Sequence, residues 1–342
     1  MRNSVRRVAG SPLGTAALNL LADILEPVGG RGSGDVIVLT YHRVDEVDAR
    51  PHLFPGLISA TPTVFERQLE ILAGRTNPVT IDDLVAAVRG TRELPDRPLL
   101  LTVDDGYEDF AEHIWPRLRR RGMPVTLFVP TAYPGDASKR FWWDRLSHAL
   151  RTTDRPSLVV DGLVLDLRTA ALRDAAFRRL RTLVKTTPHG SAMEMVDAWC
   201  AALGDPDAAS SVLDWDTLRT LAAEGVTIAP HTRTHALLTR VDDARLAVEI
   251  EGSRQDVARE IGTVVSVFAY PSGAYDDRAV AAVRRAGFDL AFTTDRGRID
   301  LRRRQDPHRL RRINVGGATS SGALRLQLLR GVGAPWADHV RG

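Results

Sequence analysis

Short apolar runs alternate along most of this 342-residue chain with stretches in which apolar residues recur at helical spacing. Such runs predict buried strands, and the stretches between them predict amphipathic helices. Parallel strands need crossover connections that are usually helices, so the alternation predicts a parallel α/β architecture. About eight strands in this order favour a (β/α) barrel. The expected strands are Val36–Tyr41, Pro78–Ile81, Leu99–Val103, Val125–Val129, Val226–Ala229, Val264–Tyr270, Leu290–Thr293 and Arg312–Val315, and the expected helices are Thr63–Ala73, Ile81–Arg89, Tyr107–Arg121, Trp215–Glu224, Asp242–Ile261 and Asp277–Ala286.

The alternation breaks once, between Tyr133 and Asp214. Three helices and a hairpin are expected there, at Trp143–Arg151, Leu158–Leu167, Thr169–Lys185 and Ala192–Leu203. The dipeptide Asp161-Gly162 is a typical hairpin turn. We therefore predict four parts, which are an amphipathic extension (1–34), a barrel (35–132 and 212–316), a mainly helical insertion that forms a wall or lid (133–211), and a C-terminal helix and tail (317–342).

Composition narrows the function classes. The chain has 46 basic and 43 acidic residues, and the resulting net charge of +3 is too small to indicate nucleic-acid binding. Its 44% hydrophobic and 26% charged residues are typical of a globular protein. The single cysteine, Cys200, excludes an intramolecular disulfide and a multi-cysteine zinc site. A metal ion would therefore have to be held by histidines and carboxylates.

The segment from Leu13 to Leu25 is moderately apolar, but Asn19 and Asp23 interrupt it and no small-residue cleavage site follows. We therefore expect no signal peptide. Its spacing fits an amphipathic helix, and no stretch reaches the roughly 18 consecutive apolar residues that a bilayer span needs. We expect no transmembrane segment and a cytoplasmic location, and contact with the inner membrane surface stays open.

Two adjacent carboxylates, Asp104 and Asp105, follow the expected strand Leu99–Val103, and Gly106 then permits a turn. The C-terminal ends of barrel strands are where such folds carry their sites. Adjacent carboxylates repel each other unless they share a cation or a proton. The pair is either a solvated helix start, where Asp is common, or a metal site in which the two acids have different roles.

Two histidines follow another expected strand, Val226–Ala229. His231 and His235 are four residues apart, so their imidazoles can converge on one ion. Alone, this spacing belongs more often to two solvent-facing or capping histidines than to a pair of metal ligands. Combined with a carboxylate at another strand end, it gives two histidines, one aspartate and open positions, which is typical of a catalytic zinc site.

Two further strand ends carry polar groups. Pro271-Ser272-Gly273 predicts a tight loop whose backbone N–H near Ser272 can stabilise an oxyanion, although a plain strand-to-helix turn explains these residues equally well. His42 and Arg43 end the first expected strand. A hydrogen-bonded histidine at the barrel rim is the alternative for His42.

Together these motifs resemble the polysaccharide deacetylase family with the NodB homology domain, carbohydrate esterase family 4. Val-Asp-Asp-Gly at 103–106 is similar to the TFDDG motif, with Val103 where Phe is usual. His-Thr-Arg-Thr-His at 231–235 is similar to the H-[ST]-x-x-H motif, and residues 41–44 and 268–273 fall in the expected order.

The resemblance implies a distorted (β/α) barrel of NodB type that hydrolyses N-acetyl groups of amino sugars in a polysaccharide or glycan precursor. It implies a divalent metal, zinc first and cobalt or nickel as alternatives, held by Asp105, His231 and His235. Asp104 would be the general base that takes the proton of the attacking water. The metal and a backbone N–H near Ser272 would stabilise the oxyanion.

The sequence departs from the family pattern at two functional positions. The late leucine-histidine motif that usually supplies the general acid does not follow Phe292. In permuted members the strand that carries this histidine comes first, and His42 fits that position, so we predict His42 as general acid. Ala269 replaces the arginine that usually orients the base. Arg312, or alternatively Arg43, is expected to substitute for it.

Two other functions stay open. Some members of the wider superfamily open small cyclic amides, so an amidase for a non-sugar amide is one alternative. A metal-bearing carbohydrate-binding relative with weak catalysis is the other, because Val103 and Ala269 differ from the usual residues.

Overall fold

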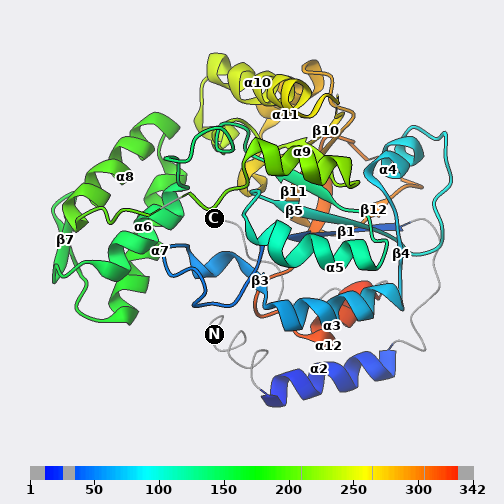
Figure 1. Cartoon of the computed structure of the whole chain (residues 1–342), viewed down its shortest axis with the longest axis horizontal. Coiled ribbons are helices and arrows are strands. Elements are labelled where there is room, and N and C mark those ends of the chain that lie inside the picture. Colours follow the sequence, from blue (N-terminus) through cyan, green and yellow to red (C-terminus); the bar gives the residue numbers. More distant parts are fainter. Residues whose placement is uncertain (1–11, 26–34, 209, 264, 304, 330–342) are drawn as a thin grey trace.

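The computed structural model describes residues 12–25, 35–208, 210–263, 265–303 and 305–329. A nearly closed barrel of parallel strands forms its centre, with helices around it (Figure 1). The strand order is β10-β11-β13-β1-β5-β6-β9, and no ladder between the described residues of β9 and β10 closes it. The predicted distorted barrel is confirmed. These strands are β1 (Asp35–Tyr41), β5 (Pro98–Asp104), β6 (Thr126–Val129), β9 (Thr227–Pro230), β10 (Val267–Ala269), β11 (Leu290–Arg296) and β13 (Leu310–Asn314).

Smaller elements complete the barrel. The short strand β4 (Asn77–Pro78) pairs with β5, β12 (Ile299–Asp300) pairs antiparallel with β1, and β2 (Arg43–Val44) pairs with β3 (Ile58–Ala60). The outer helices are α3 (Pro62–Ala73), α4 (Ile81–Val88), α5 (Trp115–Arg120), α9 (Trp215–Ala223), α10 (Asp243–Ile261) and α11 (Asp277–Arg285).

Several expected elements have other ends in the structure. The strand expected at Val264–Tyr270 is formed at Val267–Ala269, and the strand expected at Leu290–Thr293 continues to Arg296. The strand expected at Pro78–Ile81 stops at Pro78, because Thr80 and Asp83 form a reciprocal capping box that starts α4 at Ile81.

The helix expected from Tyr107 begins only at Phe110, with one π-helical turn, η2 (Phe110–Ile114), before α5. Before this turn, Tyr107 forms an antiparallel β-bridge with Val212, and the Glu108 N–H donates to the Ser211 carbonyl at 2.9 Å. These contacts hold residues 107 and 108 outside the helix.

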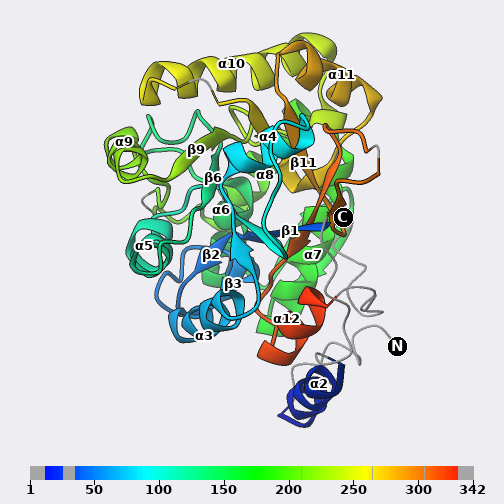
Figure 2. The same cartoon turned by 90° about the vertical axis from the view of Figure 1, so that its right-hand side faces the viewer.

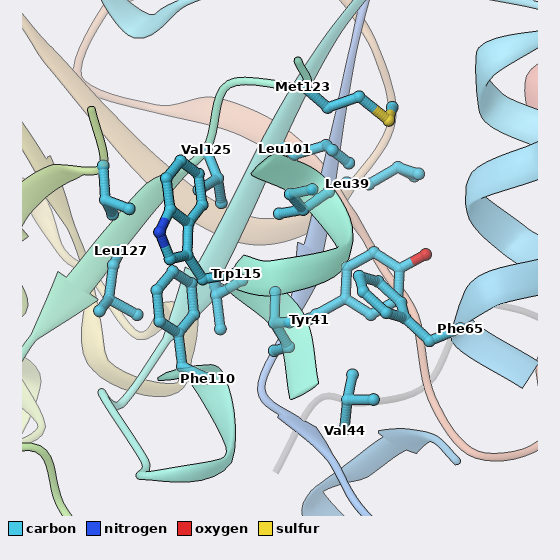
Figure 3. Packing of buried hydrophobic residues seen from close by; sticks show 14 of the residues in the cluster. Leu39, Tyr41, Val44, Phe65, Leu101, Phe110, Trp115, Met123, Val125 and Leu127 are labelled. Carbon is cyan, nitrogen blue, oxygen red and sulfur yellow. The ribbon is translucent and has the colours of Figure 1, made fainter. Parts of the chain in front are cut away.

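The central strands are buried on both faces, which explains their nearly continuous apolar sequences. Leu39, Leu101 and Leu127 belong to the cluster under α3 and α5 (Figure 3). The rings of Tyr41 and Phe65 meet edge to face, with centroids 5.2 Å apart. This core fixes the strand ends from which the polar side chains emerge.

The insertion lies on one side of the barrel (Figure 1). Its hydrophobic side chains form a separate cluster, to which Leu53, Tyr107 and Val212 also contribute. Its hairpin turns at Asp161 and Gly162, which both have positive φ, as a type I′ turn requires. Its predicted elements are confirmed as α6 (Trp142–Thr152), β7 (Ser157–Val160), β8 (Leu163–Asp166), α7 (Ala170–Thr186) and α8 (His189–Leu203).

The N-terminal helix α2 (Pro12–Leu25) lies along the C-terminal helix α12 (Ser321–Leu328) (Figure 2). At Gly322 an added Cβ would lie 2.6 Å from backbone atoms of Leu18 and Asn19, so only glycine allows this approach. None of the helices in the described ranges is long and apolar enough to span a membrane. The remaining residues of the expected extension and tail lie outside the described residues.

A buried carboxylate, Asp144, ties the insertion to the barrel. Its two oxygens accept hydrogen bonds from the Phe54 N–H and from the Tyr107 hydroxyl, both at 2.6 Å. The indole of Trp143 donates to the same hydroxyl at 2.9 Å. Tyr107 is two residues after Asp105, so the insertion is bonded directly to the loop that carries the adjacent carboxylates.

This anchor predicts a pH-dependent stability. Burial raises the pKa of Asp144 to about 7, although the two donated hydrogen bonds lower it. Between about pH 4 and pH 7 the folded chain therefore holds a proton that the unfolded chain has released, and stability falls as the pH rises. We expect this loss of stability in wild type and not in Asp144→Asn. In chemical denaturation, the free energy of unfolding of the variant minus that of wild type should therefore increase from pH 4 to 7 and then level off.

Glu194→Gln, at an exposed position on α8, controls for the loss of one negative charge. A difference between Asp144→Asn and wild type that does not change with pH would contradict the prediction.

Candidate active site

The loops after β5, β9 and β10 have an unusual backbone. Asp105, Thr232, His235 and Ser272 have φ of 78°, 65°, 56° and 53°. Few residues other than glycine adopt this region, and it is particularly unfavourable for β-branched threonine. Backbone conformations of this kind concentrate at functional sites. All four residues lie at the C-terminal mouth of the barrel, where the sequence predicts the site.

Arg312 on β13 holds the carboxylate of Asp104, the last residue of β5. Its Nη1 and Nη2 donate to Oδ1 and Oδ2 at 2.8 and 2.7 Å, and its Nε donates to the Thr293 carbonyl at 2.9 Å. Both side chains are buried. Burial opposes ionisation of Asp104, but the Arg312 charge outweighs it and lowers the pKa of this carboxyl. Asp104 is therefore an oriented carboxylate, with both oxygens engaged by one guanidinium.

The two arginines considered for this position occupy different places. Arg43 is the first residue of β2, and it donates to Asp109 at 2.7 Å and to Asp45 at 2.9 Å in a buried cluster. Arg312 is the one that the structure brings to Asp104. The usual arginine position, Ala269, contributes only its backbone here.

His231 connects β9 and β10, the two strands at the ends of the strand order. It follows β9, and its Nδ1 lies 2.7 Å from the carbonyl oxygen of Ala269 on β10. A carbonyl can only accept, so Nδ1 carries the proton and Nε2 carries the lone pair. Burial lowers the pKa of His231 to about 4, so the imidazole is neutral near pH 7. Its free lone pair faces Asp105.

Asp105, His231 and His235 form a set of converging ligand atoms. The Nε2 atoms of His231 and His235 lie 3.8 and 3.3 Å from Asp105 Oδ1, and one ligand atom from each residue lies within 4.8 Å of the others. Asp105 Oδ1 is buried and makes no hydrogen bond. An unsatisfied buried carboxylate oxygen is costly unless a cation is present. Two imidazoles and a carboxylate therefore fit a divalent metal ion.

Sequence reasoning missed the residues that support the histidine loop. Glu249 on α10 is fully buried and accepts from the N–H groups of Arg233 and Thr234 at 2.9 and 2.8 Å. About two helical turns further along α10, Asp256 accepts from Arg233 Nε at 2.8 Å and from Thr131 Oγ1 at 2.7 Å. Two acids seven residues apart share one helix face, and this spacing is the only signal for them in the sequence.

These residues open into a pocket of about 580 Å³. Its lining includes Asp104, Asp105, both histidines, His42 and Ser272, together with Trp142 and Trp143 of the insertion. His42 is half-buried and its backbone N–H donates to Ser59 Oγ at 3.0 Å. Ser272 is exposed and also lines the pocket. Side chains of the insertion thus line the same pocket.

His308, the late histidine of the chain, lies outside this pocket. It is buried, and its Nε2 lies 2.8 Å from the Phe288 carbonyl oxygen. This contact gives His308 a structural role within the barrel. Four described histidines line the pocket. They are the candidate metal ligands His231 and His235, His189 of the insertion, and His42 directly after β1.

The family of this chain follows from its sequence as well as from this geometry. The sequence profile of the polysaccharide deacetylase family matches residues 91–291, which is more than half of the chain. The chain belongs to the polysaccharide deacetylase family, whose members are hydrolases that act on carbon–nitrogen bonds other than peptide bonds. No curated protein sequence matches the chain.

Solved structures share the fold. The Streptococcus pyogenes deacetylase PplD, determined with acetate, is 17% identical with a TM-score of 0.59, and the match covers 87% of this chain and 99% of PplD. IcaB from Ammonifex degensii is 18% identical with a TM-score of 0.55, covering 86% and 98%. A Bacillus cereus polysaccharide deacetylase is 15% identical with a TM-score of 0.57, covering 86% and 69%. At these identities the likeness establishes the fold.

The buried pair of Asp104 and Arg312 is open to a double-mutant cycle. Arg312→Met would leave Asp104 as an uncompensated buried charge, and we expect it to lower the free energy of unfolding by about 3–5 kcal/mol. In the Asp104→Asn background the same change should cost at least about 1 kcal/mol less. Urea denaturation measures both values.

Arg168→Met, which removes an exposed ion pair with Asp166, is the matched control and should have little effect. Additive effects of the Asp104 and Arg312 substitutions would show that the pair is not coupled.

Proposed function

We propose that this chain is a metal-dependent de-N-acetylase that removes N-acetyl groups from amino sugars in a polysaccharide or glycan precursor. The observation that carries the proposal is the different environment of two adjacent carboxylates. Asp104 is held at both oxygens by Arg312, whereas Asp105 has a buried oxygen without a hydrogen bond beside two imidazoles. One acid is thus oriented to accept a proton, and the other is free to hold a cation.

Asp105, His231 and His235 would hold the ion, with zinc expected first and cobalt or nickel as alternatives. When bound, a divalent ion polarises the amide carbonyl and makes a water molecule more acidic. Asp104 accepts the proton of the attacking water, and Arg312 keeps that carboxylate ionised and oriented. His42 protonates the leaving nitrogen, because an amine leaves poorly until it is protonated. The backbone N–H near Ser272 donates to the developing oxyanion.

The two unusual motif residues are compatible with catalysis. Val103 is buried in the hydrophobic cluster between β5 and the outer helices. The change from the usual Phe to Val therefore exchanges one hydrophobic core residue for another. Ala269 leaves its carbonyl for His231, and Arg312 reaches Asp104 from a different strand. These contacts favour an enzyme over a binding protein that has lost its catalytic groups.

We also propose contact of α2 with a membrane surface, on the cytoplasmic side that the sequence predicts. Leu20, Leu21 and Ile24 expose 62%, 39% and 58% of their surface. The first 22 residues contain three arginines and no acidic residue, which suits an anionic lipid surface. A basic segment with an exposed apolar helix face is typical of interfacial binding.

Acetate release from N-acetylated oligosaccharides tests the enzyme. We expect metal-loaded wild type to release acetate and a chelator to abolish the release. Asp104→Asn should retain one bound ion per chain and lose at least about 100-fold in kcat, because the proton acceptor is gone. His235→Ala should lose the ion, as measured by elemental analysis, whereas His113→Ala, a partly exposed histidine away from the pocket, should retain it.

Each alternative function has its own outcome. Turnover of small non-sugar amides without turnover of sugars would identify an amidase. Metal and sugar binding without acetate release would identify a binding protein, and full activity of Asp104→Asn would exclude Asp104 as the base.

A further inference from the structure

The two histidines of the candidate metal site are supported in different ways. His231 donates from Nδ1 to the Ala269 carbonyl at 2.7 Å. Most metal-binding histidines have a bond of this kind, which fixes the orientation of the ring. In the part of the chain that the structure describes, no protein group forms such a bond with Nδ1 of His235, whose Nε2 faces Asp105 Oδ1 at 3.3 Å. Contacts of another kind must therefore orient the His235 imidazole.

Aromatic rings of the insertion pack against this imidazole. The indole of Trp143 meets the ring of His235 edge to face, with centroids 4.7 Å apart and an angle of 67° between the planes. The ring of Phe141 meets His235 in the same manner at 5.8 Å, and it stacks on Trp143 at 4.4 Å. Edge-to-face contacts are attractive and directional, so they favour one orientation of the imidazole. The insertion is thus in direct contact with a candidate metal ligand.

The backbone of His235 makes such support necessary. Its φ of 56° lies in the left-handed region, which is unfavourable for residues other than glycine. A residue keeps such a conformation only where the surrounding contacts outweigh its cost. The side chain of His235 is 8% exposed, and Trp143 and Phe141 supply part of its surroundings. Removal of the indole would therefore free both the ring and the backbone of His235 to move.

Trp143 is itself held by two buried polar groups. Its Nε1 donates to the Tyr107 hydroxyl at 2.9 Å, and that hydroxyl donates to Asp144 at 2.6 Å. Tyr107 and Asp144 expose 1% and 2% of their surface. A hydrogen bond to the indole N–H defines the rotation of the ring in addition to its packing. A continuous set of contacts thus runs from Asp144 through Tyr107 and Trp143 to His235.

A second tryptophan of the insertion, Trp199 on α8, offers a comparison. Trp143 and Trp199 are both 7% exposed and belong to the same hydrophobic cluster. Trp143 lines the pocket, whereas Trp199 is not among the described residues of the lining. The same substitution at the two positions therefore removes a similar buried side chain, but only one of the two touches the site.

We propose that Trp143 is a positioning residue of the metal site, which holds the His235 imidazole in the orientation that binds the ion. The inference rests on the proposed function, because it takes Asp105, His231 and His235 as the ligands. Since Tyr107 and Asp144 hold Trp143, docking of the insertion and binding of the ion stabilise each other. The insertion is then a support of the metal site as well as part of the pocket lining.

Zinc affinity of the metal-free protein, measured by competition with a chromophoric chelator, tests the positioning role. Trp143→Leu should weaken zinc binding about 10- to 100-fold, which is the usual effect of losing a group that orients a metal ligand. Trp199→Leu is the matched control and should bind zinc as wild type does. Equal zinc affinities in wild type and Trp143→Leu, or equal losses in Trp143→Leu and Trp199→Leu, would overturn the proposal.

Trp143→Phe is the conservative variant. It keeps a ring beside His235 and fills most of the core, so it should lose less zinc affinity than Trp143→Leu but at least about threefold relative to wild type. Should Trp143→Leu fail to fold, Trp143→Phe compared with Trp199→Phe makes the same test. Zinc affinity of Trp143→Phe equal to that of Trp199→Phe would then overturn the proposal.

The visible absorption of the cobalt-loaded protein gives a second readout, because the bands depend on the geometry of the coordinating groups. At saturating Co²⁺ we expect the bands of Trp143→Leu to differ from those of wild type, and the bands of Trp199→Leu to be unchanged. Identical spectra of wild type and Trp143→Leu would contradict a role of Trp143 in orienting His235.

A double-mutant cycle tests the route through Tyr107. Tyr107→Phe removes the acceptor of the indole N–H, so it should weaken zinc binding in wild type. It should have little effect when Trp143→Phe, which has no N–H, is already present. Additive losses would contradict this route, because Tyr107 would then act on Asp105 through the backbone.

Acetate release separates this inference from the proposed function. Zinc affinity that depends on Trp143 and His235 in a protein that releases no acetate would support the positioning role, although the proposed function fails. Acetate release that requires His235, with zinc affinity unchanged in Trp143→Leu, would overturn the positioning role alone. Zinc binding that is unchanged in His235→Ala would overturn both, because the ion would lie elsewhere.

Discussion

The bidentate ion pair between Asp104 and Arg312 is the interaction on which the site depends. Two adjacent carboxylates at the end of one strand would repel each other and share any cation between them. Arg312 neutralises Asp104 from β13, while the positive φ of Asp105 turns the next carboxylate toward His231 and His235. The two neighbouring aspartates therefore differ: Asp104 is paired with Arg312, and Asp105 faces the two histidines. The strand order of the barrel makes this pairing possible, because β5, which carries Asp104, and β13, which carries Arg312, lie on the two sides of β1.

The sequence predicts much of this arrangement for physical reasons. Buried parallel strands are nearly continuous apolar runs, so their ends, and the polar residues that follow Val103 and Ala229, are recognisable without a structure. Arg312 could be expected only because Ala269 stands where the family motif usually has the arginine that orients the base. The supports of the histidine loop could not be predicted, because Glu249 and Asp256 look like surface acids of an amphipathic helix and their burial depends on tertiary packing.

The insertion shows a second limit of sequence reasoning. Its helices and hairpin follow from periodicity and from Asp161-Gly162, but their orientation is set by Asp144, which bonds to Phe54 and Tyr107 far along the chain. That orientation brings α6 to the pocket and places Trp143 beside His235. The sequence shows two adjacent tryptophans, but only the fold shows that Trp143 meets this histidine.

We propose that Asp105 and the two histidines bind the ion while Asp104 stays with Arg312. Anomalous X-ray diffraction from crystals of the zinc-loaded protein tests it most directly. We expect one peak bounded by Asp105, His231 and His235, with Arg312 still bonded to both oxygens of Asp104. A peak coordinated by Asp104 with Arg312 displaced, or an ion bound only elsewhere, would contradict it.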